Sequence, residues 1–170
     1  MIQSSRGRIK ERQTGKDLRI SRDREARMTW CSVLHDETLA CLSERIRRQP
    51  FPAELVRYLA SDLHVEAGFL IDALGLPRGV ISRKINKNEN LSPGQAERVI
   101  GMLRLVGQVR AMVVESGKAK GFDAGRWLGE WIEQPLPALD GRFPAEYLGD
   151  SAGREWISRL LRQIQASAFA

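Results

Sequence analysis

Four side chains in this sequence belong to the types that most often hold a metal or act as a nucleophile and its base: Cys31, Cys41, His35 and His64. Their order and spacing give neither a CxxC pair nor the ligand arrangement of a zinc site. The sequence also shows no Ser/His/Asp or Cys/His set, no glycine loop that would cradle a phosphate and no carboxylate cluster. We therefore interpret the cysteines as reduced thiols and expect a protein that binds partners without catalysis, metal or cofactor.

A segment in the middle of the chain, Leu74–Asn86 (LGLPRGVISRKIN), combines a glycine turn with several basic side chains. No acidic residue lies between Ala73 and Asn88. An acid-free surface suits contact with phosphates, and a recognition helix presents its outward side chains to base edges in the major groove. We predict that DNA is contacted by six residues: Arg78, Gly79, Ser82, Arg83, Lys84 and Lys87. The alternative interpretation is the solvated face of an ordinary helical pair.

Helix signals lie on both sides of this glycine turn. Apolar residues at Leu70, Ile71 and Leu74 predict a first helix. Gly75 permits the left-handed turn that ends such a helix, and Pro77 is suited to begin the next one. In that second helix, three side chains are expected to face back onto the first: Val80, Ile81 and Ile85.

The helix that follows has a well-marked beginning. Ser92 and Gln95 form a capping box around Pro93. Its buried stripe is predicted to contain Ala96, Val99, Ile100 and Leu103. A helix-turn-helix packed against a capped helix makes a compact DNA-binding domain, which we place within residues 28–117.

The remaining pattern from Met28 onward is also helical. Leu39, Leu42 and Ile46 recur at helical spacing, and a further helix is predicted at about residues 53–63. No alternation of period two appears, so the predicted fold class is all-α. The apolar runs are short and no signal-peptide pattern follows the basic N-terminus. We expect a soluble, cytoplasmic protein that does not contact a membrane.

The net charge of +6 is concentrated at the N-terminus. Residues 1–27 contain nine Lys/Arg and four Asp/Glu, which is 9 − 4 = +5. This arm has few apolar residues and no helical period, so its composition predicts disorder. It is either a solvated tail or an accessory arm that tracks phosphates.

The C-terminal region, residues 118–170, is electrically balanced and rich in large apolar side chains. It holds seven basic and seven acidic residues and three of the four tryptophans. Asp123 is predicted to cap a helix that carries Trp127, Leu128 and Trp131 on one face. After the connector QPLPALDGRFP, a last helix is expected to bear one continuous apolar stripe: Trp156, Ile157, Leu160, Leu161 and Ile164. Such a stripe serves either the core or a partner surface.

The order of these motifs resembles the Xre/MbcA/ParS toxin-binding domain preceded by an Xre-type helix-turn-helix. The helix-turn-helix part of the resemblance consists of LGLPRGVISRKIN and NLSPGQAERVIGMLRL. The C-terminal part follows a pattern of small residues, Leu and Pro: Ala124-x-x-Trp127-Leu128, Pro137-Ala138-Leu139-x-Gly141-Arg142-x-Pro144-x-x-x-Leu148 and Gly153-x-x-x-Ile157-x-x-Leu160-Leu161. Together the resemblance covers about residues 64–165.

This resemblance implies the antitoxin of a type II toxin–antitoxin pair. The usual partner of the family is a RES-domain toxin, which resembles ADP-ribosyltransferases and consumes NAD. The antitoxin would cover the toxin with residues 118–170 and bind the promoter of its own operon as a homodimer. The residues expected to contact the toxin are Trp156, Arg159, Leu160, Gln163, Phe169 and Ala170. The alternative is a dimeric helix-turn-helix repressor that has no toxin partner.

Overall fold

The computed structural model describes residues 50–117 and 120–168. Within these residues the chain forms six α-helices, two short 3-10 helices and no strand, so the all-α prediction is confirmed for this part. The basic arm, the helical pattern at Leu39–Ile46 and the tail residues Phe169 and Ala170 lie outside the described residues. The cysteines and His35 lie outside them as well.

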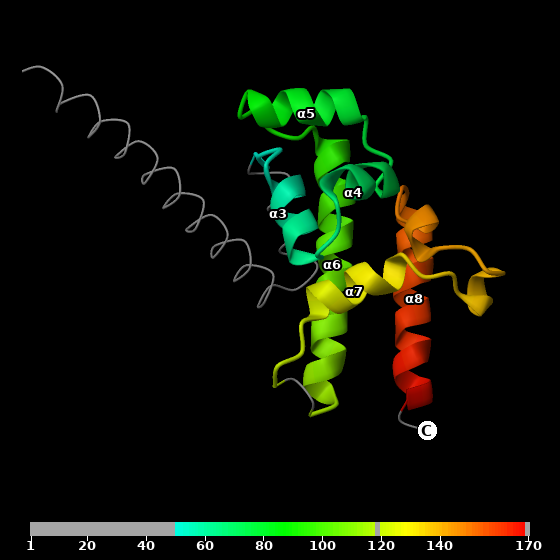
Figure 1. Ribbon diagram of the computed structural model, residues 1–170. Coiled ribbons are helices and arrows are strands. Elements are labelled where there is room, and N and C mark those ends of the chain that lie inside the picture. The colour runs from blue at the N-terminus through cyan, green and yellow to red at the C-terminus, as the bar shows by residue number, and fades with distance from the viewer. Residues whose placement is uncertain (1–49, 118–119, 169–170) are drawn as a thin grey trace, which may run out of the picture. The chain divides into compact units, whose positions relative to one another are not determined.

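Three short helices precede a long one: α3 (Leu55–Asp62), α4 (Ala67–Ala73) and α5 (Arg78–Asn86) lead to α6 (Pro93–Glu115). Figure 1 shows α5 at the N-terminal end of α6. The turn between α4 and α5 is the predicted one, because Gly75 has a φ of 60° in the left-handed region. Pro77 is the extended N-cap of α5 rather than its first helical residue.

The beginning of α6 is also as predicted. Ser92 is the N-cap, and its backbone N–H donates a 2.9 Å hydrogen bond to Oε1 of Gln95. The predicted stripe is correct at its first three positions, all of them buried: Ala96, Val99 and Ile100. Leu103 is only half-buried, whereas Met102 is fully buried. The stripe shifts because the buried side of α6 continues through Leu105 and Val109, where α7 and α8 pack on it.

Helix α7 (Ala124–Ile132) begins as expected and lies close to the end of α3. The carboxylate of Asp123 accepts a 3.0 Å hydrogen bond from the N–H of Arg126, which confirms the predicted cap. At Gly129 a Cβ atom would lie 1.9 Å from the carbonyl oxygen of Leu63, which leaves no room for any other residue. The end of α3 therefore lies directly against the backbone of α7.

The last helix, α8 (Ser151–Ala168), follows two 3-10 turns, η1 (Pro137–Leu139) and η2 (Pro144–Tyr147). It runs parallel to α6, because its contacts with α6 advance in the same direction along both helices (Figure 1). The contacts are a series of side-chain pairs: Glu97 with Arg154, Gln108 with Ser158 and Glu115 with Gln165.

The region predicted to form the DNA-binding domain and the region predicted to bind the toxin are packed together. All described residues lie in one compact unit, residues 38–170. Helix α6 contacts α3, and it also contacts both α7 and α8. The boundary at residue 117 between a DNA-binding and a toxin-binding domain stays a prediction. Helix α6 packs against elements on both sides of that boundary.

Candidate functional site

The first candidate surface is the outward side of α5, which we call the α5 face. Ile81 and Ile85 are buried, as predicted, while Val80 is half-buried. The opposite side is open to solvent at Gly79, Ser82, Arg83 and Lys87. Because Arg83 and Lys87 are four residues apart, they lie one above the other on the helix surface. The structure thus brings four of the six predicted DNA-contacting residues to one exposed side.

Arg78, the first residue of α5, is exposed but already paired. Its guanidinium donates two hydrogen bonds to the carboxylate of Asp72 on α4, one of them 2.5 Å long from Nε to Oδ1. The hydrogen bond from Arg78 lowers the pKa of Asp72 below the ordinary value of an aspartate. Because the pKa of Asp72 is lowered, the pair stabilises the fold at a pH above the ordinary pKa of an aspartate. This contribution is lost as the pH falls through the lowered pKa. That contribution is small, since both side chains are exposed.

Lys84 has a role that its sequence position did not indicate. Its ammonium group donates hydrogen bonds to the backbone oxygen of Asn90, at 2.9 Å, and to Oε1 of Gln95, at 3.0 Å. The side chain is half-buried. Lys84 therefore ties the end of α5 to the capping box of α6, and it is less available to a phosphate than Arg83 or Lys87.

The second candidate surface is the side of α8 that faces away from α6, which we call the α8 face. The predicted continuous stripe is wrong, because the structure divides it between two sides of the helix. Ile157 and Leu161 are buried, whereas Trp156 is 41% exposed and Leu160 is half-buried. At about 100° of rotation per residue, Trp156 points well away from the buried Ile157, toward a side of α8 that the core does not cover.

The α8 face contains four of the predicted toxin-contacting residues. Trp156, Arg159 and Gln163 are exposed, and Leu160 lies between them at the i+4 position from Trp156. Arg159 makes no ion pair with another described residue. The structure therefore presents an apolar strip on the side of α8 opposite the core, and the cation beside this strip is paired with no described residue.

One aromatic residue in contact with this face was not predicted to belong to it. Tyr147, the last residue of η2, packs edge-on against Trp156 with a centroid separation of 4.9 Å. No periodic pattern pointed to Tyr147, because it lies in a short 3-10 turn. The α8 face thus continues into the η2 turn.

A buried charge connects α8 to α6, the helix that follows α5. Arg154 is only 5% exposed, and its guanidinium donates to the backbone oxygen of Leu148, at 2.8 Å, and to Oε1 of Glu97, at 2.5 Å. A Cβ atom on Gly101 of α6 would lie 2.3 Å from Nε of Arg154. Gly101 therefore leaves the space through which this arginine reaches Glu97.

Next to Glu97, Arg98 holds the turn between α4 and α5. Its Nη1 donates a 3.2 Å hydrogen bond to the backbone oxygen of Leu74 and a second one to the oxygen of Gly75. These are carbonyl groups at the C-terminal end of α4, which have no partner within the helix. One turn of α6 therefore fixes both the α4–α5 turn and the start of α8.

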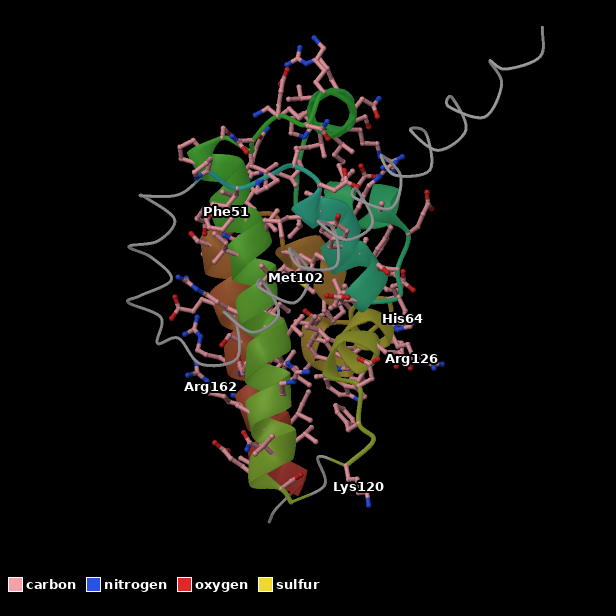
Figure 2. All side chains as sticks on the ribbon, turned by 90° about the vertical axis from the view of Figure 1, so that its left-hand side faces the viewer. Phe51, His64, Met102, Lys120, Arg126 and Arg162 are labelled. Atoms are coloured by element: carbon pink, nitrogen blue, oxygen red, sulfur yellow. The ribbon has the colours of Figure 1, made fainter. Side chains whose placement is uncertain are left out.

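A third cluster of aromatic and ionisable groups lies at α7. The rings of Trp127 and Trp131 are stacked at 6.0 Å, and Nε2 of His64 lies 3.6 Å from the carboxylate of Asp123. In Figure 2, His64 and Arg126 lie on the opposite side of α6 from Arg162 of α8.

No group of three or more His, Cys, Asp and Glu within residues 50–117 and 120–168 could hold a metal. Among the same residues, no helix combines the length and the apolar character needed to cross a bilayer.

The fold and these surfaces define a class: a small helical binding protein with one basic face and one aromatic face. No family model matches the chain. The chain is 43% identical, over 125 residues, to the Prs ADP-ribosylating antitoxin of Sphingobium sp. (strain YBL2), an alignment that spans 74% of this chain and 78% of that relative.

The chain therefore belongs to the family of that antitoxin. It is an antitoxin of a toxin–antitoxin system, and its partner is a cognate toxin. An antitoxin acts by binding, so the prediction that the protein is not an enzyme is confirmed by this membership. The antitoxin part of the family resemblance is confirmed in the same way.

Proposed function

We propose that this antitoxin silences a RES-type, NAD-consuming toxin by covering it with the α8 face, and that it represses its own operon by binding DNA as a dimer through the α5 face. The observation that carries the toxin half is the placement of Trp156 and Leu160 on the side of α8 that the core does not use. Large exposed apolar groups on one side of a helix are typical of a partner surface.

The chemical class of the toxin is supported from two directions. The C-terminal motifs resemble a domain whose usual partners are RES toxins, which resemble ADP-ribosyltransferases. The name of the Sphingobium relative links that protein to ADP-ribosylation of Prs. ADP-ribosylation draws its ADP-ribose group from NAD, so both lines favour a partner with a cleft for NAD.

The inhibitory contact has two geometries that we propose as alternatives. In one geometry, the tail that contains Phe169 and Ala170 enters the toxin's cleft. In the other geometry, the α8 face alone covers the cleft. The two differ in what happens when residues 165–170 are removed.

The DNA half of the proposal is supported by the α5 face. The left-handed turn at Gly75, the exposed Arg83 and Lys87 and the absence of any acid on α5 agree with a recognition helix. Two such helices in a dimer would read two half-sites about one helical turn of DNA apart. A repressor that has no toxin, the alternative from the sequence, is disfavoured by membership of an antitoxin family.

Co-expression with the neighbouring reading frame tests the proposal. A tagged antitoxin should retain the neighbour's product in a pull-down, and that product should consume NAD only when it is released from the complex. The same antitoxin should bind a duplex from its own promoter more tightly than a scrambled duplex. Failure to retain the neighbour, with DNA binding intact, would favour the repressor without a toxin.

A further inference from the structure

Arg78 differs from the other basic residues of the α5 face in how firmly it is oriented. Nε donates to Oδ1 of Asp72 at 2.5 Å, and Nη2 donates to Oδ2 of the same carboxylate. A two-point pair fixes the plane of a guanidinium group as well as its position. The side chains of Arg83 and Lys87 have no hydrogen bond or ion pair with any other described residue.

The flat side of the Arg78 guanidinium is also limited by α4. A Cβ atom on Gly68 would lie 3.3 Å from Nη1 and 3.4 Å from Cζ of Arg78. The lack of a side chain at Gly68 thus leaves a shallow seat for the guanidinium. Asp72 and Gly68 together hold Arg78 at the start of α5.

The hydrogen bonds to Asp72 leave part of the guanidinium free. Arginine has five N–H donors, and Asp72 accepts from two of them. The remaining donors are on Nη1 and on the outer side of Nη2, at the end of the fork. That end has the geometry for a two-point contact with O6 and N7 of a guanine.

We propose that Asp72 is a positioning residue for sequence reading, which holds Arg78 so that the free end of its guanidinium contacts a guanine in the operator. The proposal rests on the DNA half of the proposed function. The pair is too exposed, at 60% for Arg78 and 55% for Asp72, to contribute much to the stability of the fold. A carboxylate beside the DNA weakens the attraction to every phosphate, whereas an oriented arginine adds affinity only at the correct base. Asp72 therefore raises selectivity at the cost of general affinity.

The test compares Asp72→Asn with Glu66→Gln in the full-length protein. Both substitutions remove one negative charge near Arg78, because Glu66 raises the pKa of Arg78 through its charge alone, but only Asp72 is hydrogen-bonded to it. Fluorescence anisotropy would measure the affinity of each variant for a duplex from the antitoxin's own promoter and for a scrambled duplex of equal length. For Asp72→Asn we expect the promoter-to-scrambled affinity ratio to fall about tenfold. For Glu66→Gln both affinities should rise together and the ratio should stay unchanged.

Two further variants separate positioning from a merely structural effect. Asp72→Glu keeps a carboxylate within reach of Arg78, so it should restore most of the ratio. In an Arg78→Ala background, Asp72→Asn should no longer change the ratio, since there is no guanidinium left to orient. Circular dichroism would check that each variant keeps the helical fold.

Two outcomes would overturn the proposal: an unchanged ratio for Asp72→Asn, including an equal gain in affinity for both duplexes, or the same effect of Asp72→Asn in the Arg78→Ala background. A wild-type protein that binds both duplexes equally would instead refute the DNA half of the proposed function. The two failures are therefore distinguishable.

Discussion

Removal of the Arg154 side chain is the perturbation whose cost follows most directly from the structure. In an Arg154→Ala variant, the buried backbone oxygen of Leu148 loses its donor, and a hydrogen bond to a charged group is worth about 1.5–3 kcal/mol. Glu97 loses its partner too, but at 50% exposure it is rehydrated, so we add only about 0.5–1 kcal/mol. The expected loss in the free energy of unfolding is therefore about 2–4 kcal/mol.

Urea unfolding followed by far-UV circular dichroism would measure this loss. Arg159→Ala is the matched control, because it removes the same side chain from an exposed position on the same helix and should cost less than about 0.5 kcal/mol. Arg154→Met, which keeps an unbranched stem beside Gly101, should recover part of the loss. A loss below about 0.5 kcal/mol for Arg154→Ala would refute the reasoning that this arginine joins α8 to α6.

The remaining predictions concern binding, the arm, packing and the tail. Arg83→Ala should weaken binding to the promoter duplex by about 1–3 kcal/mol and leave toxin binding intact, and unchanged affinity of a well-folded Arg78/Arg83 double alanine variant would contradict the recognition-helix assignment. Deleting residues 1–27 should leave the thermal midpoint nearly unchanged and, if the arm tracks phosphates, make the salt dependence of DNA binding shallower; a large loss of stability would show that the arm is folded. Gly129→Val should lower the free energy of unfolding by more than about 2 kcal/mol, because its Cβ would clash with the oxygen of Leu63, and a smaller loss in urea unfolding would show that α3 and α7 can separate. Removing residues 165–170 should restore NAD consumption in the purified complex if the tail enters the cleft; full inhibition would assign it to the α8 face.

The local features of the fold could be predicted from the sequence because each depends on a few neighbouring residues. Gly75 in a left-handed turn, the capping box of Ser92 and Gln95, and the cap at Asp123 all follow from chemistry within four residues. The all-α class could be predicted as well, because helical periodicity also depends on residues that lie close together in the sequence.

The sequence pattern failed where the outcome depends on which elements meet. The apolar residues of α8 form one stripe in the sequence, yet α6 covers only one side of the helix and leaves Trp156 exposed. Leu103 of α6 is likewise only half-buried, because it lies beside the side of α6 that α7 and α8 cover. Periodicity gives the faces of a helix and not the number of neighbours that cover them.

The role of a charged residue was the hardest to predict. In the sequence, Lys84 and Arg154 look like any other basic residue. In the structure, Lys84 is hydrogen-bonded to the capping box of α6, and Arg154 is buried against Glu97. Their partners are 11 and 57 residues away in the sequence, beyond the reach of local patterns. The α5 face therefore has fewer free cations than its sequence indicated.

The central claim is that the α8 face binds the toxin, and the affinity of a Trp156/Leu160 double alanine variant for the purified cognate toxin tests it most directly. Ile157 and Leu161 hold α8 to the core, so this variant should keep its fold and its affinity for promoter DNA. Anchors of this kind contribute about 2–4 kcal/mol each to an interface, so the dissociation constant measured by isothermal titration calorimetry should rise at least about a hundredfold. A well-folded double variant that binds the toxin as tightly as the wild type would contradict the account.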